Sequence, residues 1–185
     1  MSDNWRPADR LPPIVSIVGQ SGVGKTVFLE KLIAELKRRG RRVGTIKHHL
    51  HDFEIDQPGK DSWRHAQAGS ETVVISSPKK VALVRRLQEE MEIDELAEHY
   101  LRDLDLILTE GYKTRARQRI EICRGAQGTS LVSPVDELLA IVTDTTFDLP
   151  VPQFDLEDVV GVADLIEVRL LGGQDQASVQ SSGRS

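Results

Sequence analysis

The chain has 185 residues, the length of a single domain that can bury a sizeable core. A formal net charge of −5 and an isoelectric point near 5.6 argue against nucleic acid or an anionic membrane as the main partner. One cysteine, Cys123, excludes a disulfide framework, and no apolar run approaches the length of a membrane span, so the sequence predicts a cytoplasmic protein.

Polar stretches at both ends predict where the folded part begins and ends. Residues 1–12 are polar and run into a proline pair, which predicts a disordered lead-in. Residues 172–185 have the composition of a flexible tail. One folded domain is therefore expected over residues 13–171.

A glycine-rich octet follows an apolar, β-branched run at residues 14–18, which predicts a buried strand. The octet fits the P-loop pattern G-x-x-x-x-G-K-[ST] and consists of Gly19, Gln20, Ser21, Gly22, Val23, Gly24, Lys25 and Thr26. Apolar residues then recur at helical spacing up to Arg39, and Gly40 supplies a C-terminal stop. Strand, glycine loop and helix form the context that a phosphate-binding P-loop requires.

The residue types of the octet suit a nucleotide triphosphate with Mg²⁺. The glycines let successive backbone N–H groups converge on one anion, and the helix that begins near Lys25 adds its positive dipole end. Lys25 is expected to act catalytically by reaching the β- and γ-phosphates, and the Thr26 hydroxyl to hold Mg²⁺. The alternative is a glycine-rich turn without a ligand, which the flanking strand and helix disfavour.

An unusually polar segment at residues 47–62 follows a second expected strand at residues 41–46. It holds three of the chain's five histidines, His48, His49 and His51, together with several carboxylates and lysines. Long ordered loops of this kind are usually functional. A nucleotide-responsive switch is the favoured interpretation, with Asp52 or Asp56 positioning the attacking water. A transition-metal site and a solvated loop without a role are the alternatives.

The segment after residue 61 predicts a short helix at 62–68, strands at 71–76 and 81–84, and a helix near 94–101. The next element is an apolar strand at residues 104–111, with Glu110 at its C-terminal end. An acidic residue at the end of an apolar strand, downstream of a P-loop, is typical of a Walker B element. Its carboxylate would hold Mg²⁺ or a water bound to it. Asp105 is the weaker candidate, and a charged residue that merely ends a strand is the bland alternative.

The last third of the chain offers a basic segment at residues 112–119, strands at 120–123 and 138–144, and a closing helix at 155–170. The basic segment could hold an anion or be a solvated loop. Residues 120–123 alternate like a strand, so Cys123 is expected to be a packing residue. Asp144 ends a buried strand and could accept hydrogen bonds from guanine, although no N-K-x-D motif supports that choice.

Strands that alternate with helices predict a three-layer α/β P-loop NTPase fold with a mainly parallel sheet. The two late strands are joined by loops alone. They therefore suggest an antiparallel extension beyond the P-loop core.

Three stretches together carry a resemblance to a known family: Lys47-His48, the run from Asp56 to Ser62, and the strand with its following residues, from Leu106 to Lys113. With the P-loop, this arrangement resembles the MobB family, the molybdopterin-guanine dinucleotide biosynthesis adaptor proteins. The resemblance covers about residues 13–170. The polar C-terminal tail departs from the family pattern without disturbing these motifs.

The resemblance implies a GTP-binding protein of the SIMIBI type that is usually a homodimer. Members are described as adaptors with weak GTP hydrolysis that assist the guanylyltransferase joining GMP to molybdopterin. Carried onto this chain, residues 19–26 would hold the GTP phosphates, with Thr26 and Glu110 near Mg²⁺. The loop from Lys47 to Asp61 would face the nucleotide or the partner, and neither nucleic acid nor a membrane is implied.

Two alternatives from other classes stay open at this point. A P-loop small-molecule kinase would use the histidine-rich loop and residues 115–119 to hold its acceptor. A metallochaperone GTPase of the nickel-insertion kind would use the three clustered histidines to bind metal. The sequence therefore leaves open whether the protein acts as an enzyme, with slow GTP hydrolysis as the expectation.

Overall fold

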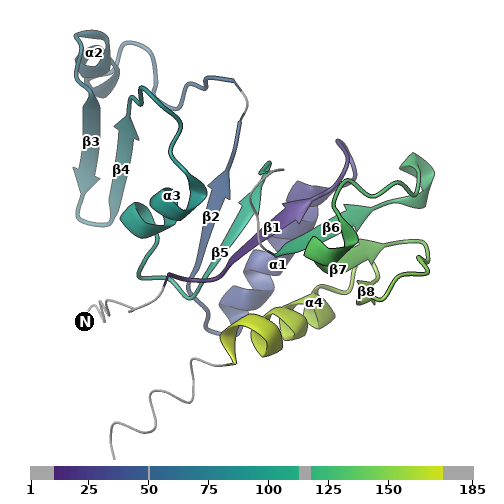
Figure 1. Cartoon of the computed structure of the whole chain (residues 1–185). Coiled ribbons are helices and arrows are strands. Elements are labelled where there is room, and N and C mark those ends of the chain that lie inside the picture. The colour runs from purple at the N-terminus through teal and green to yellow at the C-terminus, as the bar shows by residue number, and fades with distance from the viewer. Residues whose placement is uncertain (1–10, 50, 113–117, 173–185) are drawn as a thin grey trace, which may run out of the picture. The chain divides into compact units, whose positions relative to one another are not determined.

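The computed structural model describes residues 11–49, 51–112 and 118–172, and these fall into two compact units (Figure 1). The first unit takes the chain up to His48 and from Leu96 onward, and the second runs from His49 to Glu95. The expected lead-in up to residue 10, the tail from residue 173 and the centre of the basic segment, 113–117, lie outside the described residues. The predicted domain boundaries stay a prediction.

The first unit is built on a six-stranded sheet with the order β2-β5-β1-β6-β7-β8, in which all neighbouring strands are parallel. The strands are β1 (Ile14–Val18), β2 (Val43–Lys47), β5 (Leu106–Glu110), β6 (Arg119–Cys123), β7 (Leu138–Thr143) and β8 (Gln153–Phe154). Parallel strands end at the same edge of the sheet. The residues that follow β1, β5, β6 and β7 therefore share one edge, where open α/β sheets bind ligands.

Two helices cover one face of this sheet and pack against each other (Figure 1). They are α1 (Lys25–Arg38) and α4 (Val159–Ile166), the latter continued by a π-helical turn at Glu167–Leu171. Asp158 caps α4 by accepting a hydrogen bond from the Gly161 N–H at 2.9 Å. The buried core joins these helices to alternate strand residues: Val15, Ile17, Leu106, Leu108, Ile120, Ile122, Ala140 and Val142.

The opposite face of the sheet is covered by connecting segments. At the β2 edge, a Cβ on Gly44 would lie only 2.5 Å from the Cδ1 atom of Leu104, so the chain after α3 (Ile93–Tyr100) packs directly on the strand. Farther along, the buried carboxylate of Glu121 accepts hydrogen bonds from the N–H groups of Val132 and Ser133, at 2.6 and 3.0 Å. These bonds hold the β6–β7 connection, which includes 3₁₀ turns at 125–127 and 135–137, against the sheet.

The second unit contains the helix α2 (Asp61–Gln67) and an antiparallel pair of strands, β3 (Thr72–Ser77) and β4 (Lys80–Arg85). The helix α3 crosses the boundary between the two units. In the register of the hairpin, Val74 lies opposite Leu83 and Ser76 lies opposite Val81. Opposite residues share a face of the hairpin, so Val74, Leu83 and Val81 lie on the same side.

The fold class expected from the sequence is confirmed, but the antiparallel portion lies elsewhere in the chain. The late strands β6 and β7 are parallel, and the antiparallel pair is β3–β4. The connection at 124–137 is long enough to return the chain to the start of the next strand, as a parallel pair requires. Only Pro78 and Lys79 separate β3 from β4, and a two-residue connection allows only an antiparallel hairpin.

An ionic network joins the end of α1 to α4. Arg39, with only 14% of its side chain exposed, contacts carboxylate oxygens of Glu35, Asp164 and Glu167 at 2.6 to 2.9 Å. Hydrogen bonds from Arg38 and Arg39 lower the pKa of Glu35 to about 2. The bonds from Glu35, Glu167 and Asp164 in turn raise the pKa of Arg39 above its ordinary value.

Replacing Glu35 with Gln should lower the free energy of unfolding at neutral pH. It should also weaken the fall of that free energy with decreasing pH. The folded-state pKa of Glu35, about 2, lies below the ordinary value of 4.5, so the ionised carboxylate stabilises the fold above that ordinary pKa. This contribution is lost as the pH falls from there toward 2. Urea unfolding of wild type and Glu35→Gln between pH 7 and pH 3 should show the gap narrowing as the pH falls.

The exposed residue Glu30 on the same helix provides the control, because Glu30→Gln should follow wild type at every pH. A gap between wild type and Glu35→Gln that stays constant across this pH range would contradict the role given to the carboxylate.

Candidate functional site

The P-loop turns sharply away from β1 at Gly19. The φ angle of Gly19 is +138°, and a Cβ at this position would lie 2.3 Å from the carbonyl oxygen of Ile122 in β6. Only glycine can therefore connect β1 to the loop here. The loop ends at Gly24, immediately before α1 begins at Lys25, and no side chain caps the first turn of that helix. The backbone N–H groups of this turn suit an anion.

The side chain of Lys25 folds back over the loop. Its Nζ atom donates hydrogen bonds to the carbonyl oxygens of Gly19 and Gln20, at 3.1 and 2.7 Å. The ammonium group is thus held above the loop backbone. A bound phosphate would exchange these neutral carbonyl partners for charged oxygens, which form stronger hydrogen bonds.

Glu110 lies at the centre of a polar cluster beside the P-loop. It ends β5 with 7% of its surface exposed, and its carboxylate accepts hydrogen bonds from the Thr26 hydroxyl at 3.1 and 3.3 Å. The Nζ atom of Lys47 lies 2.7 Å from the same carboxylate. Burial alone would raise the pKa of Glu110, but the hydrogen bonds from Lys47 and Thr26, with the charges of Lys47 and Lys25, lower it overall. The carboxylate is therefore held ionised.

The donor set of this cluster fits a magnesium ion. A hydroxyl oxygen and an ionised carboxylate are hard oxygen ligands, and Mg²⁺ takes one or two such groups from a protein together with phosphate oxygens and water. Thr26 and Glu110 were both predicted for this role, and the structure brings them into direct contact. Lys47 forms an ion pair with Glu110 and balances the negative charge of its carboxylate.

Two motifs that lie some sixty residues apart in the sequence meet next to this cluster. The N–H of His48 donates to the carbonyl of Glu110 at 2.9 Å, and the rings of His48 and Tyr112 lie 4.6 Å apart. Gly111 allows this approach, because its φ angle is +97° and a Cβ there would lie 2.6 Å from the His48 carbonyl oxygen. The Lys47-His48 and Glu110-Gly111-Tyr112 segments therefore form one structural unit.

Asp144 directly follows β7 at the ligand-binding edge of the sheet, and its Oδ1 atom accepts a hydrogen bond from the Gly125 N–H at 2.7 Å. It ties the end of β7 to the end of β6, and its predicted contact with guanine stays a prediction. Cys123 is buried, as expected of a packing residue, and burial with the nearby charges of Glu121 and Asp144 raises its pKa.

The two aspartates proposed to position water lie in the second unit. Asp52 accepts a hydrogen bond from the N–H of Phe53, and Asp56 accepts from the N–H of Gln57 and the hydroxyl of Ser62. These are local contacts, so the catalytic role of either residue stays a prediction. Within residues 11–49, 51–112 and 118–172, no group of three or more histidine, cysteine or acidic side chains could hold a metal ion.

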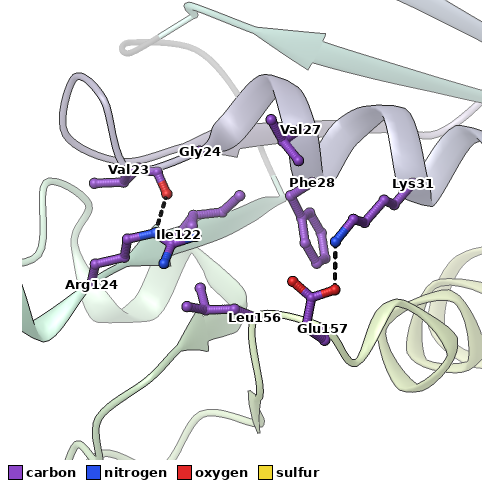
Figure 2. Close-up of a pocket in the computed structure, with 9 residues that line it drawn as sticks. All are labelled: Val23, Gly24, Val27, Phe28, Lys31, Ile122, Arg124, Leu156 and Glu157. Atoms are coloured by element: carbon purple, nitrogen blue, oxygen red, sulfur yellow. Dashed lines mark hydrogen bonds and ion pairs between the residues drawn. The ribbon is translucent and has the colours of Figure 1, made fainter.

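Arg124 is a residue of this site that the sequence analysis missed. It directly follows β6, and its Nε atom donates to the Val23 carbonyl of the P-loop at 2.8 Å (Figure 2). The segment that follows Arg124 also contacts the P-loop, because the side chain of Gln20 donates to the carbonyl of Ser130 at 3.3 Å. A basic residue at the carboxyl end of a strand could have marked Arg124 as a candidate site residue. The sequence does not reveal, however, that β6 lies next to β1.

A small hollow lies beside the first turn of α1 (Figure 2). Val23, Phe28, Arg124 and Leu156 line it, and it has a volume of about 20 Å³, which is the size of one water molecule.

Replacing Gly111 with Ala should destabilise the protein more than the same change at Gly40. Both glycines have positive φ angles, +97° and +82°, but a Cβ at Gly40 would meet nothing within 4 Å. Both variants place an alanine at a positive φ angle, and Gly111→Ala adds the clash with His48. The extra loss in the free energy of unfolding should be about 1–3 kcal/mol, measured by urea denaturation. Equal losses would show that the close approach to His48 contributes nothing.

The chain matches known proteins over most of its length. Residues 14–144 match the model of the MobB family, described as molybdopterin guanine dinucleotide synthesis protein B. The molybdopterin-guanine dinucleotide biosynthesis adapter protein of Haemophilus influenzae is 37% identical over 84% of this chain and 88% of its own length. The adapter protein of the same name from Escherichia coli is 36% identical over 83% of this chain and 91% of its own length.

Solved structures agree with these matches. The crystal structure of a molybdopterin-guanine biosynthesis protein B superposes with a TM-score of 0.67, at 33% identity, over 85% of this chain and 98% of that chain. A crystal structure of Bacillus subtilis MobB gives a TM-score of 0.67 at 27% identity, with the same two coverages. The family match favours the adapter prediction over the kinase and metallochaperone alternatives. With its P-loop and the Thr26–Glu110 contact beside it, this chain belongs to the MobB family.

Proposed function

We propose that this protein is a GTP-binding adapter that assists the attachment of GMP to molybdopterin in the synthesis of the guanine dinucleotide form of molybdenum cofactor. The observation that carries the proposal is the contact between Thr26 and Glu110 at the start of the P-loop helix. This contact joins a hydroxyl and a carboxylate next to a set of uncapped backbone N–H groups. The names of the relatives from H. influenzae and E. coli supply the pathway.

In this proposal, each part of the site has a separate task. The N–H groups of residues 19–26 and the Nζ atom of Lys25 hold the phosphates and neutralise charge that develops on the terminal phosphoryl group. Thr26 and Glu110 hold Mg²⁺, which supplies further positive charge to the β- and γ-phosphates when it is bound. Lys47 pairs with the Glu110 carboxylate and favours its ionised form, and Mg²⁺ would supply positive charge to the same carboxylate.

Slow hydrolysis of GTP is the expected activity. A fast GTPase holds a water molecule in line with the terminal phosphate, often through a glutamine. Gln20 lies in the P-loop and Gln127 lies beside it, but their side chains donate to the carbonyl oxygens of Ser130 and Gly22. Asp52 or Asp56 would have to take the water-positioning role, and a partner that orders the loop around them would increase the rate.

The proposed partners are the molybdenum cofactor guanylyltransferase, with molybdopterin, and a second copy of this chain. The hairpin β3–β4 supports a homodimer, because Val74, Val81 and Leu83 are 56%, 67% and 44% exposed and lie on one face. A two-stranded hairpin is marginally stable by itself, and exposed apolar patches mark interaction surfaces.

A cytoplasmic location and the absence of nucleic acid as a partner complete the proposal, since the net charge is −5 and the one cysteine is buried. No helix in the described part of the chain is both long and apolar enough to cross a membrane.

Calorimetric titration with GTP and ATP in the presence of Mg²⁺ tests the nucleotide. Wild type should bind GTP more tightly than ATP, and Lys25→Ala should lose at least about tenfold in affinity, because it removes a charged hydrogen-bond donor worth about 1.5–3 kcal/mol. Lys37→Ala, at the far end of the same helix, should bind like wild type. Tighter binding of ATP would contradict the GTP assignment, and no binding of either nucleotide would overturn the proposed function.

Sedimentation equilibrium tests the second copy. Wild type should form a dimer at micromolar concentrations, and Val81→Lys should shift it to a monomer, because a charge on the apolar face of the hairpin loses its hydration when two faces meet. Val168→Lys is the matched control, since Val168 is 76% exposed in the π-helical turn of the first unit. A monomeric wild type, or equal effects of the two substitutions, would exclude the hairpin as the dimer surface.

A further inference from the structure

We propose that Arg124 binds the nucleoside half of the nucleotide, with its guanidinium plane stacked on the purine base. The inference rests on the proposed function, because it assumes that the P-loop holds a nucleotide. It adds a residue and a role that the motifs of the sequence do not contain. It is carried by the position of β6, by the anchoring of the Arg124 side chain and by the shape of the surrounding chain.

The two ends of a bound nucleotide can be told apart from the order of the strands. Thr26, Glu110 and Lys47 gather on the β5 and β2 side of β1, where Thr26 and Glu110 would hold Mg²⁺ and supply its positive charge to the terminal phosphates. The terminal phosphate therefore lies on that side. Arg124 follows β6, the neighbour of β1 on its other side, toward which the nucleoside must extend.

The side chain of Arg124 is partly exposed and is anchored to the P-loop. Its Nε atom donates to the Val23 carbonyl at 2.8 Å, and its Nη2 atom lies 3.5 Å from where a Cβ of Gly24 would be. An anchored guanidinium is planar, permanently charged and weakly hydrated, and such groups stack on nucleobases and aromatic rings. The bond through Nε sets the orientation of the plane and lowers the entropy lost when a base binds.

The chain around Arg124 leaves room for a flat ring. The next residues are Gly125 and the exposed Ala126, and a Cβ on Gly128 would meet no atom within 4 Å. Asp144 lies at the same edge and holds the Gly125 N–H through Oδ1, and no described residue donates a hydrogen bond to its Oδ2. A base stacked on Arg124 would thus have a carboxylate oxygen near it, which suits the donor groups on the guanine edge.

The hollow beside α1 does not compete as the base site. It has a volume of about 20 Å³, room for about one water molecule, and the ion pair of Lys31 with Glu157 lies along one side of it. A base must therefore lie over the surface that Arg124 presents. An open platform of this kind gains its affinity from stacking rather than from enclosure.

Inorganic tripolyphosphate separates the two halves of the ligand in the test. It carries the phosphates of GTP without the nucleoside, and its binding is measured by calorimetry with Mg²⁺ on wild type, Arg124→Ala and Lys25→Ala. Arg124→Ala should lose roughly ten- to a hundredfold in affinity for GTP, the range found when a stacking side chain is removed, and should bind tripolyphosphate like wild type. Lys25→Ala should lose affinity for both ligands.

Two further variants distinguish stacking from charge and from damage to the fold. Arg124→Lys keeps the charge but not the plane, so it should lose nearly as much GTP affinity as Arg124→Ala. Arg102→Ala removes an exposed arginine that pairs with Glu98 and should behave like wild type. Wild-type GTP binding by Arg124→Lys would overturn the stacking role.

The remaining outcomes are equally decisive. Unchanged GTP binding by Arg124→Ala, or equal losses for GTP and tripolyphosphate, would overturn the inference, the latter by showing that Arg124 contacts phosphate or merely supports the loop. Wild type that binds tripolyphosphate as tightly as GTP would overturn it as well, while leaving the P-loop function intact. Wild type that binds neither ligand would overturn the proposed function itself.

Discussion

The parallel pairing of β1 with β5 on one side and β6 on the other is the constraint on which the site depends. A buried hydrogen bond of 2.6 Å between the hydroxyl groups of Ser16 and Thr109 reinforces the pairing of β1 with β5. On the β6 side, the Ser16 N–H donates to the carbonyl of Gln118 at 2.9 Å. Because these strands are parallel, their carboxyl ends meet at one edge. The P-loop, Glu110 and Arg124 are neighbours there for that reason, although up to a hundred residues separate them in the chain.

The cluster around Glu110 shows how a nearly buried carboxylate can stay ionised. Burial opposes its charge, and hydrogen bonds from Lys47 and Thr26 offset that effect. Such a group would be costly without partners. Lys47 is half-exposed, whereas the side chain of Glu110 is nearly buried, so the pair lies at the border between the core and the solvent.

The two units of the chain differ in how much apolar surface they bury. The first unit holds the P-loop, the sheet and a continuous core, and the ionic network of Arg39 fixes α1 to α4. The second unit buries little and exposes apolar residues on its hairpin. The two units therefore differ in character, because the first carries the P-loop on a continuous core and the second leaves apolar surface of the kind that marks interaction sites.

The sequence by itself determined the P-loop, its flanking strand and helix, the acidic residue Glu110 at the end of an apolar strand, and the family, because each depends on local spacing or on a motif. Only the tertiary structure decided that β6 and β7 are parallel, that Asp144 ties two strand ends together, and that Lys47 and Arg124 flank the P-loop. These facts depend on which strands are neighbours in the sheet. Strand order is set by the packing of the whole core, and no short stretch of sequence contains it.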